Sequence, residues 1–98
     1  MTITKTLNGT SLVIALEGRL DTTTAPQLET ELNDSLAGIT ELTLDFAKLE
    51  YISSAGLRVI LSAQKTMNKQ GSMVITNVCA DIMDVFEITG FSDILTIK

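Results

Sequence analysis

Histidine is absent from this chain, and Cys79 is its only cysteine. A Ser-His-Asp triad, a Cys2His2 zinc site and an intramolecular disulfide are therefore excluded, because each needs a residue type that the chain lacks or holds only once. We expect no metal and no organic cofactor. A reducing cytoplasm suits a chain with a single thiol, and we expect Cys79 to be a small buried or half-buried side chain.

Basic residues are scarce as well. Seven Lys and Arg residues stand against twelve Asp and Glu residues, which gives a net charge of −5. Nucleic acid and anionic lipid both require a basic face, so this charge argues against either and favours a protein partner.

Long apolar runs are missing too. The start of the chain lacks the apolar segment of a signal peptide, and no uncharged stretch is long and apolar enough to span a bilayer, so we expect no membrane insertion. With 98 residues, 45% of them hydrophobic, we expect a single domain over 1–98 with one core, cytoplasmic and monomeric.

The chain opens with the pattern of a hairpin. Residues 2–7 and 11–17 are β-branched or alternate in polarity, and Asn8-Gly9 between them is the strongest short hairpin signal. Two antiparallel strands are predicted, and Gly18 is expected to bend the chain into a loop over 19–23.

The next segment predicts a helix. Thr24 and Gln27 match a capping box around Pro26, so a helix should follow and run to about Gly38. Its apolar stripe is predicted from residues one turn apart: Leu28, Leu32 and Leu36.

A strand and a second helix come next. Residues 40–46 alternate cleanly, which places Leu42, Leu44 and Phe46 on one face of a strand. The helix that follows Ser53 and Ser54 should run to about Gln70 and stop at Gly71.

The chain closes with a strand over 72–77 and a short helix. Asp81 is the expected cap of this helix, and Gly90 should end it. The apolar segment over 91–97 is predicted as an edge strand.

These elements define an α/β fold class. After the hairpin, strands and helices alternate, which requires parallel pairing through right-handed crossovers. We therefore predict a two-layer domain with a mixed sheet, an N-terminal antiparallel hairpin followed by parallel strands, and helices mainly on one face. The loops after the second and third strands leave the same sheet edge, so Asp21, Thr22 and Thr23 should lie near Ser53 and Ser54.

The stretch from Leu49 to Leu61 is a turn that becomes a helix. Ser53 or Ser54 is the expected N-cap, and an exposed serine there stands where the helix dipole favours a phosphoryl group. From these residues alone, capping is the more frequent role. Gly56 costs about 1 kcal/mol against alanine in a helix, which suggests close approach by a partner or a neighbouring loop. Ala55 and Gly56 together should form a flat surface.

Two motifs of the chain resemble one bacterial family. The run from Leu42 to Phe46 followed by Tyr51-Ile52-Ser53-Ser54-Ala55-Gly56-Leu57-Arg58 is similar to the STAS family of anti-sigma factor antagonists, and so is Leu16-Glu17-Gly18-Arg19-Leu20-Asp21. The order of elements follows that family over the whole chain. Where many members have Asp-Ser-Ser-Gly or Asp-Ser-Thr-Gly, this chain has Ser53 at the acidic position and Ala55 at the second hydroxyl position.

The resemblance implies a phosphorylation-switched binding module rather than an enzyme. In its unphosphorylated form such a protein captures an anti-sigma factor, usually a serine kinase of the GHKL type, and frees a sigma factor; a serine phosphatase reverses the modification. Ser54 is the expected phosphoacceptor, with Ser53 as the alternative. The expected partner surface consists of Asp21, Thr22, Thr23, Ser53, Ala55, Gly56 and Arg58.

Two other functions remain to be compared with this one. The same kind of domain also serves as a subunit or regulator of a membrane transporter or another signalling complex. A hydrolase with Ser54 as nucleophile is disfavoured, because the chain offers no histidine base and no G-x-S-x-G turn. For Arg58, the alternatives are a contact to phosphoserine or to a partner, and an ordinary exposed helix position.

Overall fold

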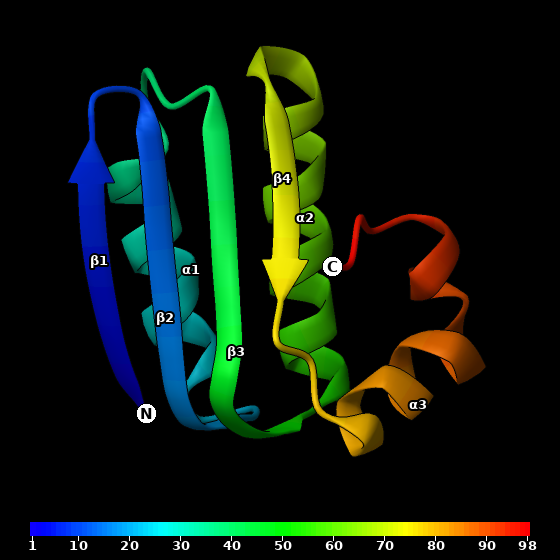
Figure 1. The fold of residues 1–98 in the computed structure, drawn as a ribbon. Helices are drawn as coiled ribbons and strands as arrows, with labels where there is room; N and C mark the ends of the chain where they lie inside the picture. Colours follow the sequence, from blue (N-terminus) through cyan, green and yellow to red (C-terminus); the bar gives the residue numbers. More distant parts are fainter.

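The sheet has four strands in the order β1-β2-β3-β4 in the computed structural model, which describes residues 1–98. The strands are β1 (Thr2–Asn8), β2 (Ser11–Leu20), β3 (Glu41–Ile52) and β4 (Ser72–Thr76). β1 pairs antiparallel with β2, whereas β2 with β3 and β3 with β4 are parallel. The predicted mixed sheet with an N-terminal hairpin is confirmed (Figure 1).

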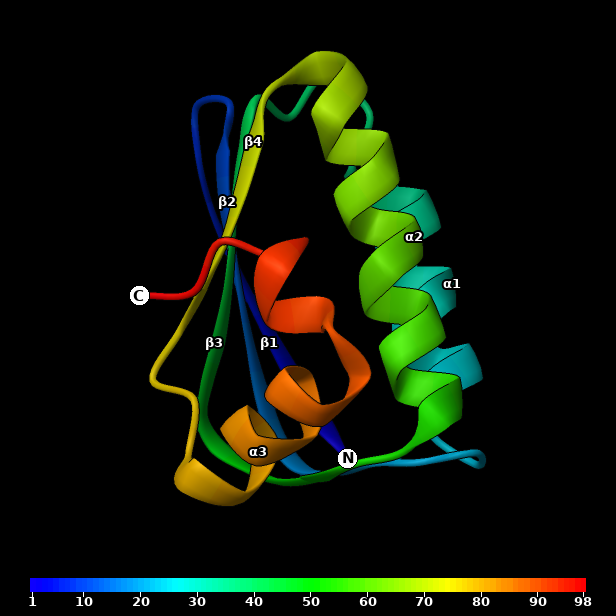
Figure 2. The ribbon, with the colours of Figure 1, turned by 90° about the vertical axis from the view of Figure 1, so that its right-hand side faces the viewer.

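The helices are α1 (Ala25–Ser35), α2 (Ser54–Gln70) and α3 (Ala80–Thr89), followed by the short 3-10 helix η1 (Phe91–Asp93). All of them lie on one face of the sheet, as Figure 2 shows, so the predicted two-layer arrangement is confirmed. None of the helices has both the length and the apolar character needed to cross a membrane.

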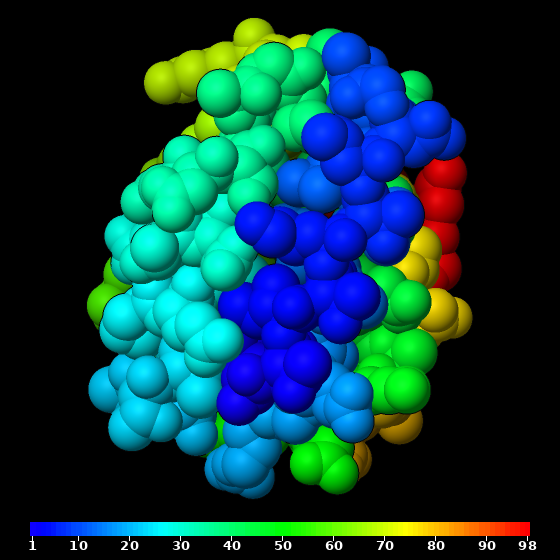
Figure 3. All heavy atoms as spheres, turned by 90° about the vertical axis from the view of Figure 1, so that its left-hand side faces the viewer, coloured from blue at the N-terminus to red at the C-terminus, as the bar shows by residue number.

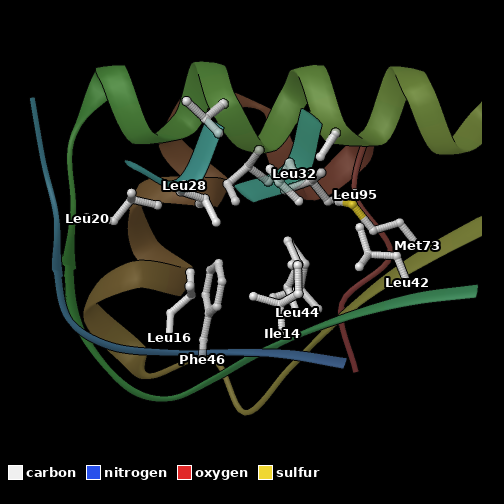
Figure 4. Packing of buried hydrophobic residues seen from close by; sticks show 14 of the residues in the cluster. Ile14, Leu16, Leu20, Leu28, Leu32, Leu42, Leu44, Phe46, Met73 and Leu95 are labelled. Carbon is white, nitrogen blue, oxygen red and sulfur yellow. The ribbon is translucent and has the colours of Figure 1, made fainter. Parts of the chain in front are cut away.

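The core lies between the sheet and the helices and forms one cluster of 24 buried hydrophobic residues (Figure 4). The predicted faces are confirmed: Leu28 and Leu32 of α1 are buried, as is Leu36 at its C-cap, and β3 buries Leu42, Leu44 and Phe46. Burial of a large apolar side chain contributes about 1.5–3 kcal/mol, so these stripes hold α1 against the sheet.

β1 is the outer edge of the sheet and lies at the surface beside α1 (Figure 3). The Lys5 ammonium lies 2.7 Å from a Glu31 carboxylate oxygen and 3.2 Å from the Ser35 hydroxyl, both on α1. A charged side chain on an edge strand also opposes pairing with another chain.

Gly18 does not end the second strand, contrary to the prediction. β2 continues to Leu20, where Arg19 pairs with Tyr51 and Leu20 with Ile52 of an equally extended β3. Two register shifts, one on each side of Gly18, absorb the irregularity, and Gly18 takes a φ of +103° that other residues rarely adopt. The extension carries both strands up to the start of α2.

The predicted capping box of α1 is wrong. Thr24 stands at the N-cap position, but its side chain makes no capping bond. Its hydroxyl lies 2.8 Å from the Arg19 carbonyl oxygen, to which it donates, while the Gln27 amide donates to the Met1 carbonyl at 3.4 Å. The Asp21 carboxylate accepts the N–H groups of Thr23 and Thr24, just before the helix, as described below. α1 also ends at Ser35 rather than at Gly38.

The C-terminal part differs from the prediction at three points. Asp81 lies in the first turn of α3 but is not its cap; Cys79 holds that position and is exposed, not buried. The segment over 91–97 is not a strand. It forms η1 and then a single parallel bridge from Ile97 to Ile75, with the Lys98 N–H donating to the Ile75 carbonyl at 2.8 Å.

Candidate functional site

The start of α2 is fixed by Ser53. Its Oγ accepts the Gly56 N–H at 3.3 Å, so Ser53 is the N-cap, one of the two residues proposed for that role. Its own N–H donates to the Leu20 carbonyl at 2.9 Å, and its carbonyl accepts the Leu57 N–H at 2.9 Å. Ser53 is half-buried, and these three bonds commit it to joining β2, β3 and α2.

Ser54 is in a different situation. It is the first residue of α2, it is exposed, and its hydroxyl makes no hydrogen bond within the protein. Of the two candidate hydroxyls, Ser54 therefore presents the one that is free to meet another molecule.

Gly56 is buried, because α2 passes very close to the strands beneath it. A Cβ at this position would lie 2.7 Å from Leu20 Cγ and 3.0 Å from Ile52 Cγ1. The close neighbour is thus the core of the protein itself. The expected flat surface of Ala55 and Gly56 is therefore wrong at Gly56, and only the half-buried Ala55 faces outward in part.

The turn between β2 and α1 is organised by Asp21. Its Oδ1 accepts the Thr23 hydroxyl at 2.7 Å, the Thr23 N–H at 3.0 Å and the Thr24 N–H at 3.1 Å. The Thr23 hydroxyl is the main cause that holds the pKa of the Asp21 carboxyl below its ordinary value, with the two N–H groups acting in the same direction. Asp21 is thus a charged local clamp that leaves Thr22 exposed at the tip.

The structure brings three of the predicted residues to one shallow depression between α1 and α2, about 410 Å³ in volume. Thr22 lines it from the turn, and Ala55 and Arg58 line it from α2. Arg58 is exposed and forms no salt bridge. The remaining lining residues, which the sequence did not single out, are Ala25, Pro26, Glu29, Val59 and Ser62. Asp21, Thr23 and Ser53 lie beside this depression without lining it.

Arg19 and Tyr51 form a further pair at this edge, which was not predicted from the sequence. The Arg19 guanidinium lies over the Tyr51 ring, 4.1 Å from its centroid, and its Nε lies 3.8 Å from an Asp21 carboxylate oxygen. Tyr51 is 40% exposed. Tyr and Arg are enriched where proteins bind one another. Their adjacency arises from the extended pairing of β2 with β3, so only a correct strand length could have revealed it.

The fold and this site define a small α/β domain that presents a free hydroxyl at a helix start, beside an exposed turn. Residues 2–98 match the family model of the STAS domain, so the chain belongs to the STAS domain family, as the resemblance indicated.

Two relatives are similar in sequence to most of this chain. BtrV of Bordetella bronchiseptica, named as a proposed anti-sigma factor antagonist, is 39% identical over 88 residues, which cover 88% of this chain and 76% of BtrV. The anti-sigma-B factor antagonist of Listeria monocytogenes is 34% identical over 88 residues, which cover 87% of this chain and 76% of that protein.

Solved structures share the fold at lower identity. An anti-sigma factor antagonist from Mycobacterium paratuberculosis is 20% identical with a TM-score of 0.88, covering 98% of this chain and 83% of that one. The Bacillus cell fate determinant SpoIIAA in its phosphorylated form is 18% identical with a TM-score of 0.77, covering 99% and 91%. A sulfate transporter family protein from Wolinella succinogenes is 16% identical with a TM-score of 0.78, covering 93% and 75%. The fold alone therefore does not distinguish an anti-sigma factor antagonist from a domain of a transporter family protein.

Proposed function

We propose that this chain is an anti-sigma factor antagonist whose binding is switched off by phosphorylation of Ser54. In its unphosphorylated form it captures an anti-sigma factor that is also a serine kinase of the GHKL type, and a sigma factor is released. A serine phosphatase restores the binding form. The names of the two relatives at 39% and 34% identity support this role over that of a transporter subunit. We expect the protein to act in the cytoplasm, as a monomer.

The observation that carries the proposal is the free hydroxyl of Ser54 next to a serine whose hydroxyl is already used. Ser53 Oγ accepts the Gly56 N–H, so modification there would disrupt the cap that starts α2. Ser54 Oγ can instead attack the γ-phosphorus of ATP: the Oγ–P bond forms, the bond between the γ-phosphorus and the bridging oxygen of ADP breaks, and the hydroxyl proton passes to a base of the kinase. Hydrolysis by the phosphatase returns the hydroxyl and inorganic phosphate.

The proposed partner surface lies beside this hydroxyl. Thr22, Ala55 and Arg58 line the depression between α1 and α2, and Arg58 is the basic residue among the lining residues. Asp21 and Thr23 set the shape of the turn, and Ser53 holds the helix start. Gly56 is buried beneath this surface and contributes indirectly, because the absence of a side chain lets α2 lie against Leu20.

Phosphorylation should end binding without unfolding the domain. A phosphoryl group brings a charge of about −1.5 to −2 and three hydrated oxygens to an exposed position where the helix dipole favours negative charge. A partner packed on Ala55 would have to remove water from this group. A penalty of about 3 kcal/mol already weakens binding more than 100-fold.

The experiment is phosphosite mapping and affinity measurement with the cognate anti-sigma factor and ATP. Wild type should be labelled on Ser54, Ser54→Ala should bind without being labelled, and Ser54→Asp should be folded but bind poorly. Ser53→Ala is the matched control, since it lacks the neighbouring hydroxyl but keeps Ser54. Label that persists in Ser54→Ala and disappears in Ser53→Ala would assign the switch to Ser53 instead.

A further inference from the structure

The proposed function accounts for Ser54 but not for the position of Arg58. Arg58 follows Ser54 by four residues in α2, and both side chains are exposed. Residues at this spacing lie on one side of a helix, with their Cβ atoms about 6 Å apart. An arginine side chain spans that separation easily.

Arg58 is also uncommitted. It takes part in neither of the two salt bridges of the structure, and its guanidinium makes no hydrogen bond. Glu29, which lines the same depression from α1, is not within ion-pair distance of it. No salt bridge or hydrogen bond inside the protein therefore has to break for the guanidinium to move.

The geometry of α2 places Arg58 at the side of the depression that is nearer to Ser54. Each helical residue advances by about 100°, so Arg58 is turned about 40° from Ser54, while Ala55 and Ser62 are turned about 100° and 80° in the same direction. From this intermediate position the side chain can serve either the depression or an oxygen on Ser54.

We propose that Arg58 is the counter-ion of phosphorylated Ser54, and that its guanidinium leaves the depression for the phosphoryl group when Ser54 is modified. This proposal rests on the proposed function, because it assumes that Ser54 carries phosphate in the cell. Guanidinium and phosphoryl oxygens form charge-assisted, bidentate hydrogen bonds, which a lysine ammonium reproduces only as a point charge. Phosphorylation then changes the partner surface twice: it adds an anion and removes the cation at the rim of the depression.

The test uses the full chain with phosphoserine installed at position 54 during translation, so that no kinase is needed. Phosphorus NMR titration gives the second pKa of the phosphoryl group, near 6 when unperturbed. In a bidentate pair the two charges lie about 4 Å apart, and a unit positive charge at that distance in water lowers the phosphoryl pKa by about 0.8, a change in proton affinity of about sixfold. Arg58→Gln should therefore raise this pKa by about 0.8, and Arg58→Lys should restore part of the difference.

Lys65→Gln is the matched control. It removes the same charge from the same helix, but Lys65 lies about 16 Å from Ser54 along the axis of α2, beyond the screening length of about 10 Å at 0.1 M salt. Its phosphoryl pKa should equal that of wild type. Proton NMR of the Arg58 side chain provides a second measurement: its Nε–H signal should shift when phosphoserine replaces Ser54.

Equal phosphoryl pKa values in wild type and Arg58→Gln, at 0.1 M salt and with both proteins folded, would overturn the pairing. That result would leave the proposed function intact, because a switch by the anion alone needs no counter-ion. Conversely, a kinase that never labels Ser54 would remove the proposed function while leaving the measured pairing as a property of the installed phosphoserine.

Discussion

Replacement of Gly56 by alanine offers the sharpest test of how closely α2 packs against the sheet. A Cβ there would lie 2.7 Å from Leu20 Cγ and 3.1 Å from Leu20 Cδ2, and it would also approach Ile52. Leu20 has no exposed surface and Cγ is its branch point, so the whole side chain must shift. Overpacking of this kind costs about 1–3 kcal/mol.

Helix propensity acts in the opposite direction. Alanine is favoured over glycine by up to about 1 kcal/mol in a helix. The two effects combine to a net loss of about 1 kcal/mol in the free energy of unfolding of Gly56→Ala, which corresponds to a melting temperature lowered by about 4–8 °C in a domain of this size. Thermal and urea unfolding measure it.

The cause can be isolated by removing the neighbour. In a Leu20→Ala background the added methyl group would enter the vacated space, so Gly56→Ala should there be neutral or stabilising, and the two changes should not be additive. Ser62→Ala, an exposed position of the same helix, is the control and should stay within about 0.5 kcal/mol of wild type. If Gly56→Ala stabilised wild type by the full helix-propensity gain, the close approach would have no energetic cost and this explanation of Gly56 would be refuted.

Three further predictions concern the same region and the neighbouring strand. Leu57→Asp should lower the free energy of unfolding by several kcal/mol, because Leu57 is buried and a carboxylate there would have no partner; wild-type melting would contradict the helix orientation. Ser53→Ala should cost about 1 kcal/mol through loss of the cap, seen as a shift of the urea midpoint at unchanged slope, and no shift would show that the cap is energetically idle. Hydrogen bonds from the Asn77 amide and the Ala47 N–H hold the pKa of Asp45 below its ordinary value of 3.8, so the stability they supply is complete above that value and is lost as the pH falls through the lowered pKa. Asp45→Asn should therefore flatten the pH dependence of unfolding below about pH 4, and an unchanged acid profile would exclude this carboxylate as its source.

The local sequence determined the elements whose causes lie within a few residues. Asn8-Gly9 predicted the hairpin, although the two turn residues are Gly9 and Thr10 because Asn8 still pairs with Ser11. The spacing of Leu28, Leu32 and Leu36 predicted the buried face of the α1 segment, and Gly71 ended α2 as predicted. Turn chemistry and side-chain period act over one or two turns, so they can be recognised without the fold. The STAS family was likewise recognisable from short motifs.

The features that define the site depend on strands that are far apart in the sequence. The length of β2 beyond Gly18 was decided by its pairing with β3, and this pairing alone set Arg19 on Tyr51 and Leu20 under Gly56. The Thr24 side chain does not cap α1, because its hydroxyl donates to the Arg19 carbonyl of the extended β2.

The assignment of the two serines has the same physical origin. Sequence left Ser53 and Ser54 as equal candidates for the cap, because both precede an apolar helical pattern. The bond from the Ser53 N–H to the Leu20 carbonyl fixes Ser53 at the end of the sheet, so its side chain turns to the Gly56 N–H and Ser54 is left at the surface. Local patterns determined that a helix starts here, while the pairing of distant strands decided which hydroxyl remains free.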